Sequence, residues 1–127
     1  LEVNLFERRK LWDIYEKGLL PMEKSGFFKL LRPPKNCKHN AHMVAILFPN
    51  PSIANKVREF LNKNGIQAVI HYVPLHTSPM GKRLGYLPLD LPLTVDAAAS
   101  LIRLPLHLSM DEIDIDYIIS NLHSYFY

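Results

Sequence analysis

The fold is decided by residues 42–72, which read HMVAILFPNPSIANKVREFLNKNGIQAVIHY. The run 42–48 is almost entirely apolar and predicts a central strand that is covered on at least one face. Residues 50–65 begin with Asn-Pro, which suits an N-cap and a first helical position, and they end with a glycine that suits a C-cap. Residues 66–72 then read as the next strand. This β-α-β unit of about 30 residues predicts a right-handed crossover and a parallel strand pair.

Three elements are expected on the N-terminal side of this unit. Residues 4–18 predict a helix with one apolar face, which ends at Gly18 and is blocked by Pro21. Residues 27–31 predict a short strand, and the polar residues 35–42 predict the loop of a hairpin.

Four elements are expected on the C-terminal side: one helical turn in 80–85, a short helix in 94–100 capped by Thr94, an extended strand in 101–106, and a last helix that begins with a capping box of Ser109 and Glu112. Pro105 lacks a backbone donor, which favours an edge position for the strand of 101–106. Together the elements predict one α/β (α+β) domain over residues 1–127, entered by the helix of residues 1–20. Its small mixed sheet would have about three to five strands, with helices packed on it.

Length and composition describe an ordinary globular chain. The 127 residues are 48% hydrophobic and 21% charged, which fits one domain. A formal net charge of +3 favours anionic ligands but is lower than expected for a dedicated nucleic-acid binder. The single cysteine, Cys37, excludes an internal disulfide and favours a reducing, cytoplasmic compartment. The first residue is Leu rather than Met, so we expect a piece of a longer chain, and no run is long and apolar enough to span a membrane.

Polar rings follow the strand of residues 66–72, in the sequence HYVPLH of residues 71–76. Pro74 favours an extended Val73, so His71 and Val73 are expected to point one way and Tyr72 the other. A polar tip where a buried strand leaves its sheet is a common place for a ligand site. The alternative is that these histidines have structural roles.

Cys37, His39 and His42 are candidate ligands of a metal ion. Their spacing is not that of a structural zinc site, and no second ligand pair occurs elsewhere. We therefore expect a polar loop and no metal.

Several motifs in a fixed order suggest a family: REFL at 58–61 leading into NGI, HYVPLHTSPMG at 71–81, GY at 85–86, LPL at 104–106 and LSMDE at 108–112. This order resembles the C-terminal part of the DegT/DnrJ/EryC1/StrS sugar aminotransferases. The run 71–81 is most similar to members that aminate dTDP-linked 4-keto-6-deoxy sugars, and the resemblance is weakest over residues 20–45.

The resemblance implies the small C-terminal domain of the fold type I aminotransferase architecture. Pyridoxal phosphate (PLP) and its Schiff-base lysine would then belong to a larger domain outside this chain, so the chain alone would bind no cofactor and be inactive. His71 and Tyr72 match the family's pair at the edge of the active site and would contact a nucleotide-linked keto sugar. His76 would either join them or brace the loop. The parent would be a cytoplasmic homodimer that takes its amino group from a donor such as glutamate, for cell-surface polysaccharide or deoxyamino-sugar synthesis.

The alternative function is a stand-alone α/β binding or interaction module without catalysis. RNA binding is disfavoured because the basic residues are dispersed and no glycine- and aromatic-rich strand motif is present. In either case we expect an exposed apolar patch, formed by Leu1, Val3, Leu5 and Phe6 of the first helix, and self-association through it.

Overall fold

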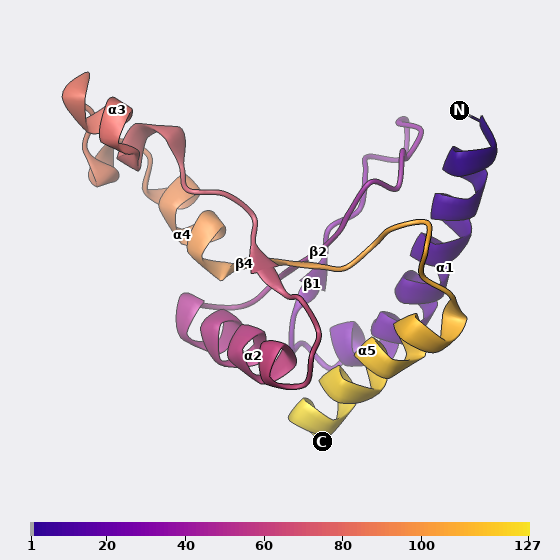
Figure 1. Ribbon diagram of the computed structural model, residues 1–127. Helices are drawn as coiled ribbons and strands as arrows, with labels where there is room; N and C mark the ends of the chain where they lie inside the picture. Colours follow the sequence, from indigo (N-terminus) through magenta and orange to yellow (C-terminus); the bar gives the residue numbers. More distant parts are fainter. Residues whose placement is uncertain (1) are drawn as a thin grey trace.

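The structure, a computed structural model, describes residues 2–127 as one small sheet with helices on it (Figure 1). In chain order the elements are α1 (Glu2–Lys24), β1 (Lys29–Leu30), β2 (Val44–Leu47), α2 (Pro51–Lys63), β3 (Val69–Ile70), the 3-10 helix η1 (Leu75–Thr77), α3 (Pro79–Arg83), the 3-10 helix η2 (Pro88–Asp90), α4 (Pro92–Ser100), β4 (Leu101–Leu104) and α5 (Glu112–Phe126). The strand order is β1-β2-β4-β3. The expected α/β class, a small sheet with helices packed on it, is confirmed.

The expected parallel pair is wrong, because β4 lies between β2 and β3. Both strands pair with β4 in antiparallel register, so they run in the same direction without bonding to each other. Ile46 pairs with Ile102, and Val44 pairs with Leu104. All four of these side chains are buried, so β4 adds a row of apolar side chains to the core beside β2.

The expected edge position of β4 is also wrong. Pro105 comes directly after Leu104, the last residue in the ladder, so its missing N–H leaves no hydrogen bond of the sheet unmade. The proline ends a central strand and does not interrupt it.

Helix α1 extends beyond the expected range 4–18 at both ends. Gly18 does not end it, because α1 packs there against α5, and a Cβ at this position would meet the side chain of Ile119. Pro21 is accommodated near the end of the helix. The chain leaves the helical conformation at Gly26, whose φ is +82°.

The N-cap of α2 is confirmed, whereas that of α5 is shifted. The side chain of Asn50 accepts a hydrogen bond of 3.0 Å from the backbone N–H of Ile53. The box expected at Ser109 forms two residues later, where Asp111 accepts from the N–H of Asp114 and the carboxylate of Asp114 accepts from the N–H of Asp111. Aspartate caps as well as serine does, and both carboxylates favour the positive end of the helix dipole.

The core lies between one face of the sheet and helices α1, α2 and α5. Its largest fully buried side chains are Tyr15, Leu19, Met22, Leu30, Ile46, Leu61, Ile102, Ile115, Leu122, Val44 and Val57. The Tyr15 hydroxyl donates a hydrogen bond of 2.8 Å to the carbonyl of Pro105, which ties α1 to the chain that follows β4. Burial, with the charge of Asp114, raises the pKa of Tyr15, so the phenol stays protonated as a donor.

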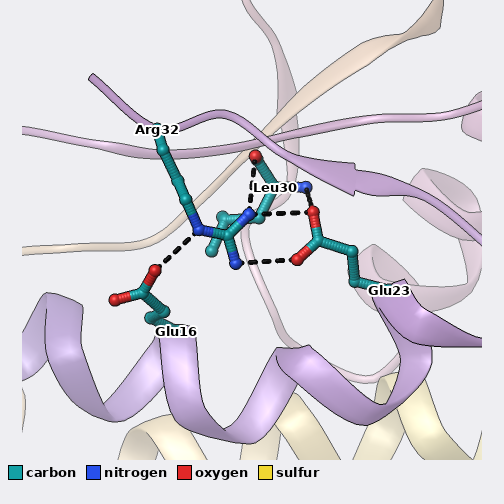
Figure 2. Close-up of polar contacts among 4 residues, drawn as sticks. All are labelled: Glu16, Glu23, Leu30 and Arg32. Atoms are coloured by element: carbon teal, nitrogen blue, oxygen red, sulfur yellow. Dashed lines mark hydrogen bonds and ion pairs between the residues drawn. The ribbon is translucent and has the colours of Figure 1, made fainter. Parts of the chain in front are cut away.

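A charged cluster joins α1 to the start of the β1–β2 loop, as Figure 2 shows. The Arg32 guanidinium donates to both carboxylate oxygens of Glu23, at 2.9 and 2.7 Å, and to Glu16 at 2.6 Å. Glu23 also accepts from the backbone N–H of Leu30. The hydrogen bond to Arg32 is the main cause that lowers the pKa of Glu23, so the pair stays charged and holds β1 against the end of α1.

Residues 72–93, which we call the apolar arm, carry large apolar side chains without being buried. Figure 1 shows this arm at one end of the molecule, away from α1 and α5. Its exposed large hydrophobic residues are Tyr72, Val73, Leu75, Met80, Leu84, Tyr86, Leu87, Leu89, Leu91 and Leu93. The expected cap of the following helix is wrong: α4 begins at Pro92, with Leu91 as its N-cap residue instead of Thr94.

The apolar patch expected on the first helix is thus not the main one. Val3 and Phe6 are exposed, Leu5 is half-buried, and Leu1 lies outside the described residues. The apolar arm exposes more large apolar side chains than this helix does. Across residues 2–127, no helix combines the length and the apolar character needed to cross a bilayer.

Candidate functional site

The two ring side chains that follow β3 lie together. The chain leaves the ladder after Ile70, and the rings of His71 and Tyr72 are 4.7 Å apart between centroids, with their planes at 56°. The expectation that they point to opposite sides is wrong, because side chains alternate only while the backbone stays in a regular strand. The two rings are thus near each other, but not in the orientation that the sequence predicts.

Arg103 of β4 is the third member of this group, and sequence reasoning missed it. Arg103 pairs with Val69, two residues before His71, and its guanidinium carbon lies 5.2 Å from the centre of the Tyr72 ring. This distance is that of a cation–π contact. A signal was present, because Arg103 is the one charged residue in the otherwise apolar run 101–106. The proline in this run predicts an edge strand, and that prediction gives the arginine no partner across the sheet.

The electrostatics of the group favour a neutral imidazole beside a fixed cation. Burial lowers the pKa of His71, and the nearby charges of Arg103 and His42 lower it further. The Nδ1 atom of His71 and the Nε atom of Arg103 are both buried and make no hydrogen bond to the part of the chain that is described. Both nitrogens are thus unsatisfied hydrogen-bonding groups, the guanidinium nitrogen as a donor and the imidazole nitrogen as a donor or acceptor.

His76 lies in a different environment from His71 and Tyr72. It is buried in η1, with 7% of its surface exposed, and its Nε2 atom has no hydrogen-bond partner among residues 2–127. The backbone of η1 packs closely on α3, since a Cβ on Gly81 would meet the carbonyls of Leu75 and His76. The structure therefore brings together two of the three predicted site residues and places the third inside the turn that follows.

The pair lines one hollow and Arg103 lines another. The first, of about 470 Å³, is lined by residues 71–75 and by α4, including Thr94. The second, of about 590 Å³, is lined by Arg103, His42, Gln67 and His107 among others. His76 lines a third hollow, of about 680 Å³, inside the apolar arm. Arg103 thus shares its hollow with the imidazoles of His42 and His107, whereas His71 and Tyr72 line the first hollow.

The two histidines of the loop that follows β1 make local contacts. His39 packs on the ring of Trp12 with centroids 4.5 Å apart, and His42 contacts the side chain of Asn40. Cys37 is exposed. Within residues 2–127, no three His, Cys, Asp or Glu side chains are placed to hold a metal ion.

The overall shape of the chain is that of known aminotransferases. It matches PseC from Helicobacter pylori, an aminotransferase of pseudoaminic acid biosynthesis, with 22% identity and a TM-score of 0.80, over 96% of this chain and 32% of PseC. It matches DesV from S. venezuelae with 20% identity and a TM-score of 0.84, over 98% of this chain and 32% of DesV.

A third match is Spr1654 from Streptococcus pneumoniae, provisionally named a sugar aminotransferase, with 22% identity and a TM-score of 0.83 over 97% of this chain and 31% of Spr1654. Structures of Spr1654 include forms with PLP and with PMP. This chain thus spans about a third of the length of each of these proteins. At such identities the likeness establishes the fold.

Membership is established by a family model that matches nearly the whole sequence. The model of the DegT/DnrJ/EryC1/StrS aminotransferase family covers residues 1–123. This match agrees with the order of motifs from the REFL helix to the LSMDE turn. The chain therefore belongs to the DegT/DnrJ/EryC1/StrS aminotransferase family.

Proposed function

We propose that this chain is the C-terminal domain of a PLP-dependent aminotransferase that acts on a nucleotide-linked 4-keto-6-deoxy sugar, most similar to dTDP-4-amino-4,6-dideoxygalactose transaminase. The observation that carries the substrate class is the His71–Tyr72–Arg103 group. Its rings suit packing on a hexose, and its cation suits the phosphates of a nucleotide. The amino donor would be glutamate or a similar amino acid, and the product would serve cell-surface polysaccharide or deoxyamino-sugar synthesis in the cytoplasm.

The cofactor lysine is proposed to lie on a part of the enzyme outside this chain. PLP, when bound, supplies the electron sink for amino transfer, and its lysine needs a sheltered site beside a phosphate cup. Every lysine in the described residues is exposed, and none lines the three hollows around the site. The role of this chain would be to hold the sugar nucleotide and to keep water away from it.

A homodimer is proposed for the parent enzyme. The support is the apolar arm, in which Leu75, Leu89 and Leu93 are each more than four-fifths exposed. Several large apolar side chains exposed on one segment of a folded chain mark an interaction surface.

The test uses the full-length enzyme with substitutions at the pair. If His71 and Tyr72 hold the sugar nucleotide, His71→Ala and Tyr72→Phe lower kcat/KM by roughly 3- to 100-fold, the range for a lost hydrogen bond to a neutral or a charged partner. The absorbance of the bound cofactor stays unchanged. His123→Ala, an exposed histidine on α5, is the matched control and keeps wild-type kinetics.

His76→Ala separates binding from bracing. Since His76 is buried inside η1, its loss is expected to lower the melting temperature more than the kinetics. Wild-type kinetics in His71→Ala, together with a lowered melting temperature, would reject the proposed site and indicate a structural role for His71.

A further inference from the structure

We propose that Arg103, with His71 and His42 beside it, forms an anion site that takes a phosphate group. This proposal rests on the proposed function in one respect only, which is that the phosphate is part of the diphosphate of the sugar nucleotide. The anion site itself is argued from the positions and partners of these three side chains.

The first argument is that Arg103 has no acidic partner among the described side chains. Arg32, in contrast, is matched by two carboxylates, Glu16 and Glu23. Among the described residues, no hydrogen bond or ion pair is made by the side chain of Arg103, although its Nε atom is buried. A guanidinium without a partner in a partly buried position costs free energy unless something anionic meets it.

The second argument is that the neighbouring groups are positive or neutral. His42 lines the same hollow as Arg103, and His71 follows Val69, the ladder partner of Arg103, by two residues. Among the described residues that line this hollow, the one carboxylate is that of Asp114, which already accepts the N–H of Asp111 in the cap of α5. An anion that enters this hollow therefore meets the guanidinium of Arg103 and the imidazole of His42.

The third argument is that the guanidinium is held in place. Arg103 is in the ladder of a central strand, with paired residues on both sides, Ala45 in β2 and Val69 in β3. Its guanidinium carbon lies 5.2 Å from the centre of the Tyr72 ring. A planar guanidinium has the fork geometry that suits phosphate, and the contact with the ring reduces the conformational entropy that it loses on binding.

Two sources of phosphate fit this chemistry, the sugar nucleotide and the cofactor. The proposal favours the nucleotide, because Arg103 contacts Tyr72 of the pair assigned to the sugar. Pyridoxamine phosphate provides the cofactor arm of the test, since it lacks the aldehyde that would modify the exposed lysines.

The experiment is an NMR titration of this chain with inorganic diphosphate, dTDP and pyridoxamine phosphate, read at the arginine Nε–H signals and at the amides of residues 69–72. Inorganic diphosphate is expected to shift the Arg103 signal. Arg103→Gln is expected to weaken its binding roughly 10-fold or more, as for the loss of a charge-assisted hydrogen bond. Arg103→Lys keeps the charge but not the planar fork, so its affinity for diphosphate is expected to lie between those of the wild type and Arg103→Gln.

Arg58→Gln is the matched control. Arg58 also has a buried Nε without a partner, but it lies on α2 and lines none of the three hollows described above. This variant is expected to bind diphosphate as the wild type does. The dispersion of the amide spectrum reports whether Arg103→Gln is folded, and Arg103→Lys carries the test if it is not.

The proposal is overturned if diphosphate leaves the wild-type signals unmoved, or if folded Arg103→Gln and Arg103→Lys bind as tightly as the wild type. Tighter binding of pyridoxamine phosphate than of dTDP overturns the assignment to the nucleotide. Failure of the proposed function has a different signature: diphosphate binding depends on Arg103, whereas His71→Ala leaves the kinetics of the full-length enzyme unchanged.

Discussion

Strand β2 and the apolar arm are both rich in large apolar residues, yet β2 is buried and the arm is exposed. Val44 and Ile46 of β2 are fully buried, whereas Leu89 and Leu93 of the arm are 84% and 83% exposed. The difference is in what packs on them. β2 has a strand on each side and helices over one face, whereas η2 and the first turn of α4 are short, proline-containing segments with one side toward solvent. Apolar composition alone does not make a core, because burial requires neighbouring elements.

The sharpest way to break this comparison is to truncate one leucine of the core to which β2 belongs and one leucine of the arm. Leu122 of α5 is fully buried, and Leu122→Ala is expected to lower the free energy of unfolding by about 2–5 kcal/mol. Leu89→Ala, the matched control on the arm, is expected to change it by no more than about 0.5 kcal/mol. Urea denaturation followed by circular dichroism measures both. Equal losses in the two variants would mean that the arm is part of the core.

Two ion pairs of α1 are expected to differ by a smaller amount, because one is partly buried and the other is exposed. The guanidinium of Arg32 binds Glu23 and Glu16 of α1, and Arg32→Gln is expected to cost about 1–2 kcal/mol, because Glu23 is largely buried while Arg32 is 33% exposed. Lys10→Gln removes the exposed pair with Glu7 and is expected to cost under about 0.5 kcal/mol. A double-mutant cycle of Arg32→Gln with Glu23→Gln isolates the pair, and a coupling free energy near zero would contradict this account.

The pH dependence of stability involves two histidines with lowered pKa values. Burial is the largest cause that lowers the pKa of His39, beside Trp12, and of His71, directly before the arm. The folded state therefore binds fewer protons than the unfolded state as the pH falls through the ordinary histidine pKa. Stability is expected to be higher at pH 8 than at pH 5.5.

The same denaturation experiment at several pH values checks this dependence. His39→Gln and His71→Gln are each expected to reduce the slope between pH 8 and pH 5.5. The lowered pKa of Glu23 acts in a separate window, since it adds stability that is lost only at more acid pH, below the ordinary glutamate pKa. Stability that increases on acidification from pH 8 would rule out this assignment of the two histidines.

The smallest expected effect lies at the junction of the two regions. Arg103 in the sheet lowers the pKa of His71, so Arg103→Gln is expected to raise that pKa toward its ordinary value without restoring it, since burial remains the larger cause. Arg58→Gln is expected to leave it unchanged. An NMR titration of the imidazole signals measures the shift. An unchanged pKa of His71 in Arg103→Gln would show that the charge of Arg103 does not act on His71.

Local signals in the sequence predicted the elements well, and long-range contacts explain most of the errors. The cap at Asn50 is confirmed because its partner, Ile53, is three residues away. The errors at Gly18 and Pro105 arise from distant partners: α5 packs on Gly18, and the pairing of β2 with β4 ends at Leu104. The same holds for the site, where His71 and Tyr72 are neighbours in sequence, whereas Arg103 joins them only through the pairing of β3 with β4.

By itself, the sequence determined the α/β class, the helix that follows Asn50, and the motifs that belong to the family, because these depend on short-range periodicity, capping and residue order. Only the tertiary structure decided that β4 separates β2 from β3, that Arg103 lies against Tyr72, and that the leucines of the apolar arm stay exposed. The physical reason is that strand pairing and burial depend on which distant segments compete for the same neighbour, and a local pattern does not record that competition.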